Sequence, residues 1–246
     1  MPSGERASIP AESDVLCENC GYVLNGLPPD ARCPECGKPA AESDPNLRRP
    51  TVFERAAAER APAGGAFLST SAAALFLPTR FYRSLATRPE TPQALMFAHV
   101  YWGLSSLLLA LAGYAHSAWF VFGDPRTPLN PVHWVLLALP VYAFITLTNL
   151  LAARLTHWEA SYRGLRLTLP VVRRGLYYHS IHYVPVAAVA ALTVLVYGHS
   201  VRHGVVDPTR ATPYYLYALS GEVVLAAFYL FWTYWIGMRN MMYANA

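Results

Sequence analysis

The stretch from residue 95 to residue 122 reads LMFAHVYWGLSSLLLALAGYAHSAWFVF and contains no Asp, Glu, Lys or Arg. A helix of about 20 apolar residues is long enough to cross the hydrocarbon core of a bilayer. Three further apolar stretches of sufficient length lie at about 132–153, 180–200 and 214–237. We therefore expect an all-α membrane protein whose residues 93–246 form a bundle of four transmembrane helices.

Charged residues are scarce in this chain and unevenly distributed. Of its 246 residues, 54% are hydrophobic and only 14% are charged, whereas about 25% of an ordinary soluble domain is charged. Ten of the fifteen acidic residues lie in the first 59 positions. This distribution argues against a soluble enzyme and predicts a small polar head on a membrane-embedded body.

Arginines in the short flanks of the spans predict the topology. One side of the membrane receives Arg80, Arg83, Arg88, Arg154, Arg163, Arg166, Arg173, Arg174 and Arg239. The other side receives only Arg126, Arg202 and Arg210. By the positive-inside rule both termini are cytoplasmic, with outer loops near residues 123–131 and 201–213. The first apolar run comes too late for a signal peptide, so we expect a multi-pass membrane protein.

All four cysteines lie within twenty residues, in the runs CENCG (17–21) and CPECG (33–37). Two Cys-x-x-Cys pairs separated by twelve residues have the spacing of a four-thiolate zinc site, and a glycine after each pair relieves the tight turn. Four protein ligands leave no position for a substrate, so the zinc would be structural. Two disulfides would need an oxidising compartment, and a redox dithiol would need a thioredoxin-like scaffold. The predicted ligands are Cys17, Cys20, Cys33 and Cys36.

The sequence around these cysteines is divided as follows. Residues 1–14 are expected to be disordered, residues 15–38 to form a zinc ribbon and residues 39–65 to form a linker with a short helix. Within the linker, residues 38–50 have the composition of a flexible spacer, and Thr51-Val-Phe-Glu54 is a capping box that starts the helix. Gly64-Gly65 is expected to break the chain. Residues 66–92 then supply interfacial or re-entrant helices, because their apolar run is too short to span.

Two resemblances to known families follow from these motifs. The run CENCGYVLNGLPP (17–29), followed by CPECG (33–37), resembles the N-terminal zinc ribbon of many planctomycete-type bacterial membrane proteins. That resemblance implies a cytoplasmic, adaptor-like head and no reaction. The body resembles the Yip-like family of small multi-span proteins, through FLPTRFY (76–82) before the first span and through Tyr162-Arg163 and Leu169-Pro170 before the third. That family implies a role in membrane trafficking or organisation without catalytic residues.

An offset of 83 residues aligns the two halves of the body without gaps. The polar matches are Arg80/Arg163, Arg83/Arg166, His99/His182, Tyr114/Tyr197, His116/His199, Ser117/Ser200 and Asp124/Asp207. These residue types are scarce here, so their agreement at one offset predicts a two-hairpin internal repeat. Two spans per unit would relate the halves by an axis along the membrane normal. Each arginine pair would form a cytoplasmic cluster suited to anionic headgroups.

A few polar residues in the apolar stretches are candidates for intramembrane function. An acid inside a span is costly and suggests a functional site, which makes Glu222 a candidate with His116, His199 or Asn149 as its partner. Histidines on two helices can also hold haem, but the two histidines of each helix are 17 residues apart and do not share a face, which favours packing at the headgroup level or hydrogen bonding across the bundle. A cytoplasmic metal or proton-handling cluster of His157, Glu159, His179 and His182 is a further alternative. The intramembrane candidates are Glu222, His99, His116, His182 and His199.

The expected function is that of a non-enzymatic membrane protein. No catalytic triad, phosphate-binding loop or metalloprotease motif is present. Residues 1–50 carry a net charge of about −3, which argues against nucleic acid as a partner. The expected partners are the lipid bilayer and an unknown protein that binds the zinc ribbon. The alternative is a small transporter or a redox or haem-type protein that uses Glu222 and the histidines.

Overall fold

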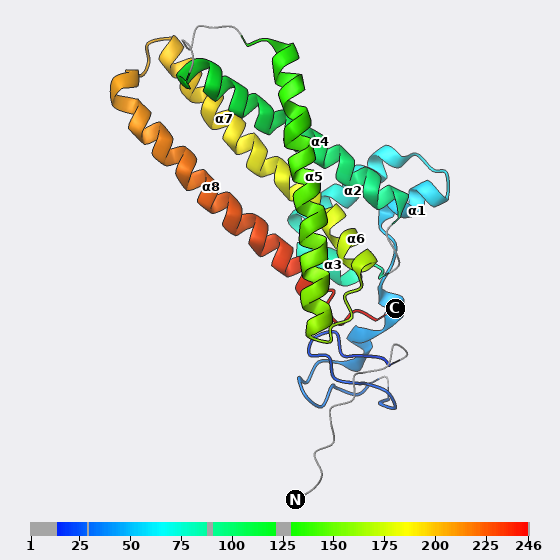
Figure 1. Ribbon diagram of the computed structural model, residues 1–246. Coiled ribbons are helices and arrows are strands. Elements are labelled where there is room, and N and C mark those ends of the chain that lie inside the picture. The colour runs from blue at the N-terminus through cyan, green and yellow to red at the C-terminus, as the bar shows by residue number, and fades with distance from the viewer. Residues whose placement is uncertain (1–13, 29, 88–90, 122–128, 246) are drawn as a thin grey trace, which may run out of the picture. The chain divides into compact units, whose positions relative to one another are not determined.

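The computed structural model describes residues 14–28, 30–87, 91–121 and 129–245. The predictions for residues 1–13, Arg88, Asp124 and Arg126 lie outside this part of the chain. The described residues form helices and contain no strand (Figure 1). The chain divides into two compact units. Unit 1 consists of the residues up to Thr91 with 153–175 and 236–245, and unit 2 consists of 92–152 and 176–235.

Four helices are long and apolar enough to cross a membrane, which indicates a multi-pass membrane protein. They are α4 (Pro92–His116), α5 (Pro131–Tyr162), α7 (Tyr183–Arg202) and α8 (Pro208–Arg239). A π-helical turn, Ser117–Val121, extends α4. Helix α6 (Leu169–His179) leads into α7 through the short 3-10 turn Ser180–His182. Helices α5 and α8 extend beyond the apolar stretches that predict them at both ends, because the helical backbone continues past the residues that need the hydrocarbon core.

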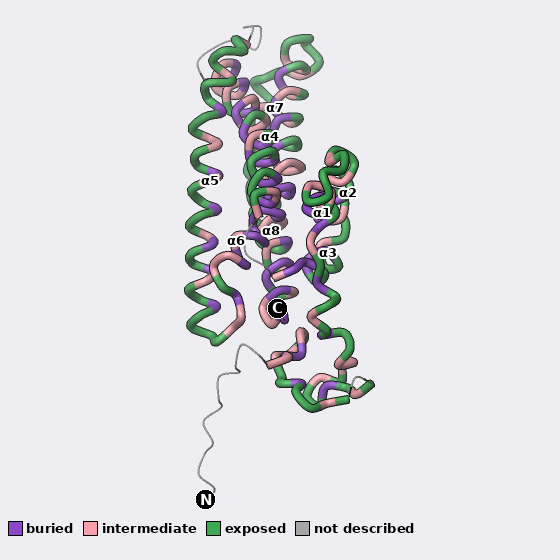
Figure 2. The backbone as a smooth tube through the Cα atoms, turned by 90° about the vertical axis from the view of Figure 1, so that its right-hand side faces the viewer, coloured by how far each residue is buried: buried purple, intermediate pink, exposed green. Residues whose placement is uncertain are grey.

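Unit 2 buries small residues and exposes large apolar ones. The candidate span of α4 is the most buried of the four and that of α8 the least. Figure 2 shows buried residues along α4 and α7, whereas α5 is largely exposed. Ala112 and Ala115 of α4 pack with Ala191 of α7 and with Trp119. Small residues at such an interface allow close backbone approach, which is how helices associate in lipid.

Close approach is tightest at Gly198 of α7. A Cβ atom there would lie 2.3 Å from the ring of Trp119. The guanidinium of Arg202 lies 5.4 Å from the centre of the same ring. Trp119 therefore fills the space that a side chain at position 198 would need.

Unit 1 contains three further helices, α1 (Val52–Ala58), α2 (Ala63–Phe76) and α3 (Pro78–Ser84). The capping box is confirmed, because the Thr51 hydroxyl accepts the Glu54 N–H and the Glu54 carboxylate accepts the Thr51 N–H. The predicted break at Gly64-Gly65 is wrong. Both glycines lie in the first turn of α2, where no neighbouring atom requires a missing side chain.

The segment 38–50 differs from the flexible spacer that its composition predicts. It contains two short 3-10 turns, Ala40–Ser43 and Pro45–Leu47. Asp44 accepts the Asn46 N–H and thereby caps the second turn. Near the end of the segment the side chain of Arg48 is almost completely buried and pairs with Glu18, which anchors this part of the segment.

Candidate metal centre and the contacts that hold it

The four-cysteine head, residues 14–38, consists of two copies of the same local motif sixteen residues apart. In the first, the Cys17 N–H donates to the Tyr22 carbonyl and the Gly21 N–H to the Cys17 carbonyl. In the second, the Cys33 N–H donates to the Lys38 carbonyl and the Gly37 N–H to the Cys33 carbonyl. Antiparallel bridges flank both turns, between Leu16 and Val23 and between Arg32 and Pro39.

Glycine is needed after each cysteine pair for conformational reasons. Gly21 has φ of 82° and Gly37 has φ of 72°, in the left-handed region that a Cβ atom disfavours. Each turn brings the two thiols of its pair to the same side of the backbone. The Cys-x-x-Cys-Gly pattern is thus a local signal that predicts this tight turn from five consecutive residues.

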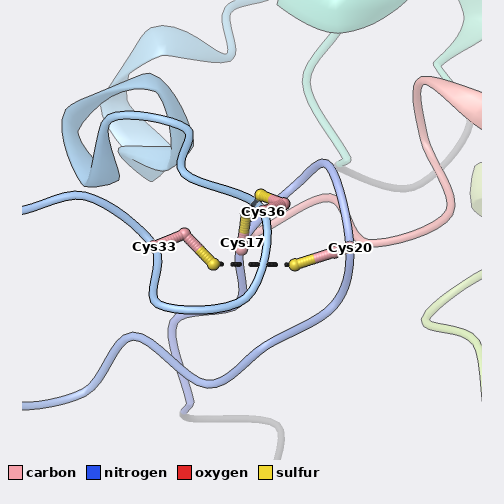
Figure 3. A group of neighbouring side chains, drawn as sticks. All are labelled: Cys17, Cys20, Cys33 and Cys36. Carbon is pink, nitrogen blue, oxygen red and sulfur yellow. Dashed lines mark hydrogen bonds between the residues drawn. The ribbon is translucent and has the colours of Figure 1, made fainter.

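The two turns bring all four thiols together, as Figure 3 shows. The four sulfur atoms lie within 4.8 Å of one another. The Sγ atoms of Cys17 and Cys36 are 3.5 Å apart, and those of Cys20 and Cys33 are 3.6 Å apart. A disulfide bond would need about 2.05 Å, and all four cysteines are free thiols. This group can hold a metal ion, and it is the one group of three or more His, Cys, Asp or Glu in the described residues that can.

The backbone around the cluster affects how readily the thiols ionise. The N–H of Lys38 hydrogen-bonds the Cys36 sulfur and lowers the pKa of that thiol to about 6. Burial raises the pKa of the Cys17 thiol. The half-buried Cys36 is therefore predisposed to be a thiolate, while the buried Cys17 needs a cation beside it to ionise.

Beneath the thiols the head has a very small apolar core. It consists of Cys17, Leu24 and Cys33, with a few partly buried neighbours. A core of this size is too small to stabilise a fold alone. Other contacts must therefore contribute.

The missing contacts come from the C-terminal segment, residues 240–245, which follows α8. The Asn245 side chain accepts the Leu16 N–H at 2.9 Å and donates to the carbonyls of Leu16 and Ser43, both at 2.8 Å. Asn245 is 2% exposed, so its side-chain amide hydrogen-bonds these backbone groups instead of water. The ring of Tyr243 packs against Gly21, where a Cβ atom would lie 2.7 Å from it.

Arg48 joins the head to two other parts of unit 1. Its guanidinium forms a two-point ion pair with the Glu18 carboxylate, at 2.6 and 2.9 Å. It also donates to the carbonyls of Tyr82 and Leu85 at the end of α3, and to the Asn240 carbonyl just after α8. Five hydrogen bonds to a planar guanidinium explain how this charge can be buried.

Glu54 forms a second buried ion pair. Its carboxylate accepts from Arg174 of α6 at 2.5 Å and from the Thr91 hydroxyl at 2.7 Å. The same carboxylate completes the capping box of α1. The capping box was visible in the sequence, but its connection to Arg174 was not, because 120 residues separate the two.

The intramembrane candidates contact different partners. His99 bonds the Tyr142 hydroxyl, His182 bonds the Tyr229 hydroxyl, and His116 bonds the Tyr215 hydroxyl. His199 lies against His203. The carboxylate of Glu222 accepts a hydrogen bond from the Thr193 hydroxyl, and within the described residues it forms no hydrogen bond with His116, His199 or Asn149. The five candidates therefore do not meet at one site.

The predicted cytoplasmic cluster of histidines is also not formed. His157 bonds the Leu167 carbonyl, and Glu159 pairs with Arg163 at 2.7 Å. His179 bonds the Thr233 hydroxyl, and its ring centre is 5.1 Å from that of His182. Within the described residues, each of these side chains is accounted for by a local contact or by a neighbouring helix.

The 83-residue offset recurs in some contacts of unit 2. His99 and His182 occupy matching positions, and each bonds a tyrosine on the next span. Positions 119 and 202 are also related by this offset. Their side chains differ, but Trp119 and Arg202 contact each other. The partners Tyr142 and Tyr229 are 87 residues apart, one helical turn from strict equivalence. The predicted pair Asp124/Asp207 lies partly outside the described residues, so the internal repeat stays a prediction.

No family model, no curated protein and no solved structure matches this chain. The functional reading therefore depends on the geometry described above.

Proposed function

We propose that this chain is a non-enzymatic protein of the bacterial inner membrane whose zinc-binding head recruits a protein partner. The observation that carries the proposal is the closed four-thiol cluster, in a head that is joined by buried contacts to the segment after the last span. A metal with four protein ligands has no open position for a substrate, so it supplies structure. The head then acts as a rigid surface presented at the membrane.

Zinc is the metal that fits the donor set best. Tetrahedral zinc with Zn–S bonds of about 2.3 Å separates its sulfur ligands by about 3.8 Å. The sulfur pairs at 3.5 and 3.6 Å approach that value. Four thiolates also favour zinc over magnesium or calcium, which prefer oxygen ligands. The ligands would be Cys17, Cys20, Cys33 and Cys36, in a zinc ribbon of the planctomycete type.

The surface of the head supports protein binding. Tyr22 and Val23 follow the first cysteine pair and are exposed, although both are apolar. Asp30 and Glu35 are exposed on the same head and keep its surface acidic. An exposed tyrosine beside an aliphatic residue is a common anchor at protein interfaces, and the acidic surroundings favour a basic partner.

The membrane body, which resembles the Yip-like family, would anchor and orient the head. Both termini would be cytoplasmic, since the arginine distribution predicts it and reduced thiols need that compartment. The alternative, a small transporter or a redox or haem-type protein, would be supported by convergence of Glu222 with the histidines. Their separate contacts do not favour it.

The test is site-specific photo-crosslinking of the full-length protein in the membranes of its own cells. A photoreactive residue at position 22 should give a discrete adduct with one protein, and Cys33→Ser should abolish that adduct. A photoreactive residue at the exposed Glu59, outside the head, is the matched control. Absence of an adduct from positions 22, 23 and 35, or an adduct that persists without the metal, would overturn the proposal. Glu222-dependent ion flux in proteoliposomes would instead support the transporter.

A further inference from the structure

Helix α3 lies beside the end of the fourth candidate span. The ring of Tyr82 is 3.2 Å from the position that a Cβ atom on Gly237 would occupy, and Gly237 lies in the last turn of α8. The Tyr82 hydroxyl also donates to the Gly175 carbonyl of α6. α3 therefore packs against the last turn of α8, at the end of the apolar stretch 214–237.

Two arginines on α3 have no carboxylate partner. Arg80 and Arg83 are exposed, lie one helical turn apart and make no side-chain hydrogen bond or ion pair within the described residues. Their counterparts at the 83-residue offset differ in this respect. Arg163 is paired with Glu159, and Arg166 donates to the Asp14 carbonyl at 2.7 Å. Of these two pairs, the α3 pair is the one without such a contact among the described residues, so it is available to bind an external anion.

A pocket of about 660 Å³ lies beside this pair, and Arg80 and Arg83 both line it. Lys38 lines it as well. The two carboxylates at its wall are already neutralised, since Glu18 is held by Arg48 and Glu42 lies 3.7 Å from Lys38. The pocket is therefore electrostatically suited to a negatively charged group.

The same pocket has an apolar edge that water would not favour. Phe76 and Leu77, at the junction of α2 and α3, are 75% and 54% exposed. Exposed large apolar residues next to arginines are typical of segments that lie in the interfacial layer of a membrane. The apolar edge distinguishes a lipid from a free phosphate.

We propose that Arg80 and Arg83 bind the phosphate of an anionic phospholipid headgroup, while Phe76 and Leu77 contact its acyl chains. Guanidinium groups bind phosphate through paired hydrogen bonds, and two of them one turn apart can hold the same headgroup. The bound lipid would fill the pocket and neutralise both cations.

The test uses the full-length protein in neutral-detergent micelles, with fluorescent phosphatidylglycerol and phosphatidylcholine as the probes. Two arginines at an anionic surface correspond to a preference of roughly 30-fold. The wild-type protein should therefore bind phosphatidylglycerol about 30-fold more tightly, and the double variant Arg80→Gln, Arg83→Gln should lose this preference. The matched control is Arg163→Gln with Arg210→Gln, which removes the same charge from exposed arginines that already face carboxylates and should leave the preference intact.

Further variants separate the lipid from other anions. Phe76→Ser with Leu77→Ser should weaken the binding of both lipids and preserve the preference between them. Glycerol phosphate, a soluble headgroup, should compete only weakly. If the double glutamine variant does not fold, the single variants carry the test, each with a loss of about fivefold. Equal losses in the α3 and control variants, or competition by glycerol phosphate at the affinity of the lipid, would overturn the proposal.

Discussion

Unit 1 and unit 2 use charged and apolar side chains in opposite ways. In unit 1 the side chains that connect distant segments are buried charges, Arg48 with Glu18 and Arg174 with Glu54. In unit 2 the connections are small apolar residues along α4 and α7, and the exposed surface is rich in Leu, Val and Phe. The difference follows from the solvent, because burial in a lipid-facing bundle releases little hydrophobic energy between helices. Close packing holds one unit, and specific polar contacts hold the other, together with a four-thiol group that can hold a metal.

The largest expected effect of a single substitution is confined to unit 1 and leaves unit 2 folded. Cys33→Ser should abolish metal binding and unfold the four-cysteine head, since binding to such a site contributes about 10–16 kcal/mol of apparent free energy. The helices of unit 2 should remain inserted. Elemental analysis should fall from one zinc per chain to none, and limited proteolysis should cut within residues 14–47 of the variant alone. Proteolysis that also degrades α4 and α7 would contradict this separation.

Next in size is the effect of breaking a buried ion pair. Arg48→Met should destabilise unit 1 by about 3–5 kcal/mol, because it leaves the charge of the Glu18 carboxylate buried without a cation, with the Asn245 N–H as its remaining donor. Adding Glu18→Gln should restore part of that loss. Hydrogen exchange of the head amides should report both changes. If the double variant is no more stable than the single one, the buried charge on Glu18 is not the source of the loss.

A packing change in unit 2 should have a smaller effect. Gly198→Ala should cost about 1–3 kcal/mol, because the new methyl group would displace the Trp119 ring. The control is Gly113→Ala in α4, where no atom lies within 4 Å of the new Cβ, and helix propensity should make it neutral or slightly stabilising. Thermal denaturation in detergent measures both. Equal melting temperatures for the two variants would mean that Trp119 moves freely.

The two halves of the head allow the finest comparison. Gly21→Ala and Gly37→Ala should each cost about 1–2 kcal/mol, because both glycines have positive φ. Gly21→Ala should cost more, since only its methyl group would meet the Tyr243 ring. The excess should disappear in a Tyr243→Ala background, measured as the chelator concentration that removes half of the metal. An excess that persists would show that Tyr243 does not support the first turn.

Local patterns made some of these features predictable from sequence. The paired cysteines, the capping box at Thr51 and the apolar runs each encode a structure within a few residues or one helix. The contacts of Arg48 and Asn245 have no such signal, because Leu16 and Asn245 are 229 residues apart and both belong to common residue types. The composition of residues 38–50 indicated a flexible segment, because composition does not reveal that the Arg48 guanidinium has five hydrogen-bond acceptors on residues distant in sequence. The histidines were identified as polar residues in apolar helices, but their tyrosine partners depend on how the helices pack.

The contacts of Asn245 with the head also constrain the order in which the protein is made. Residues 14–38 leave the ribosome before the first span, whereas Asn245 leaves it after the fourth. The four thiols can bind a metal early, yet the backbone groups of Leu16 in the head and of Ser43 beyond it lack their Asn245 partner until the helices have been inserted. Until then the head exposes unsatisfied amides and an unfilled surface at Gly21, which chaperones or proteases can recognise. Closure of this contact marks a chain whose four candidate spans have all been synthesised, because it joins a segment made before them to one made after them.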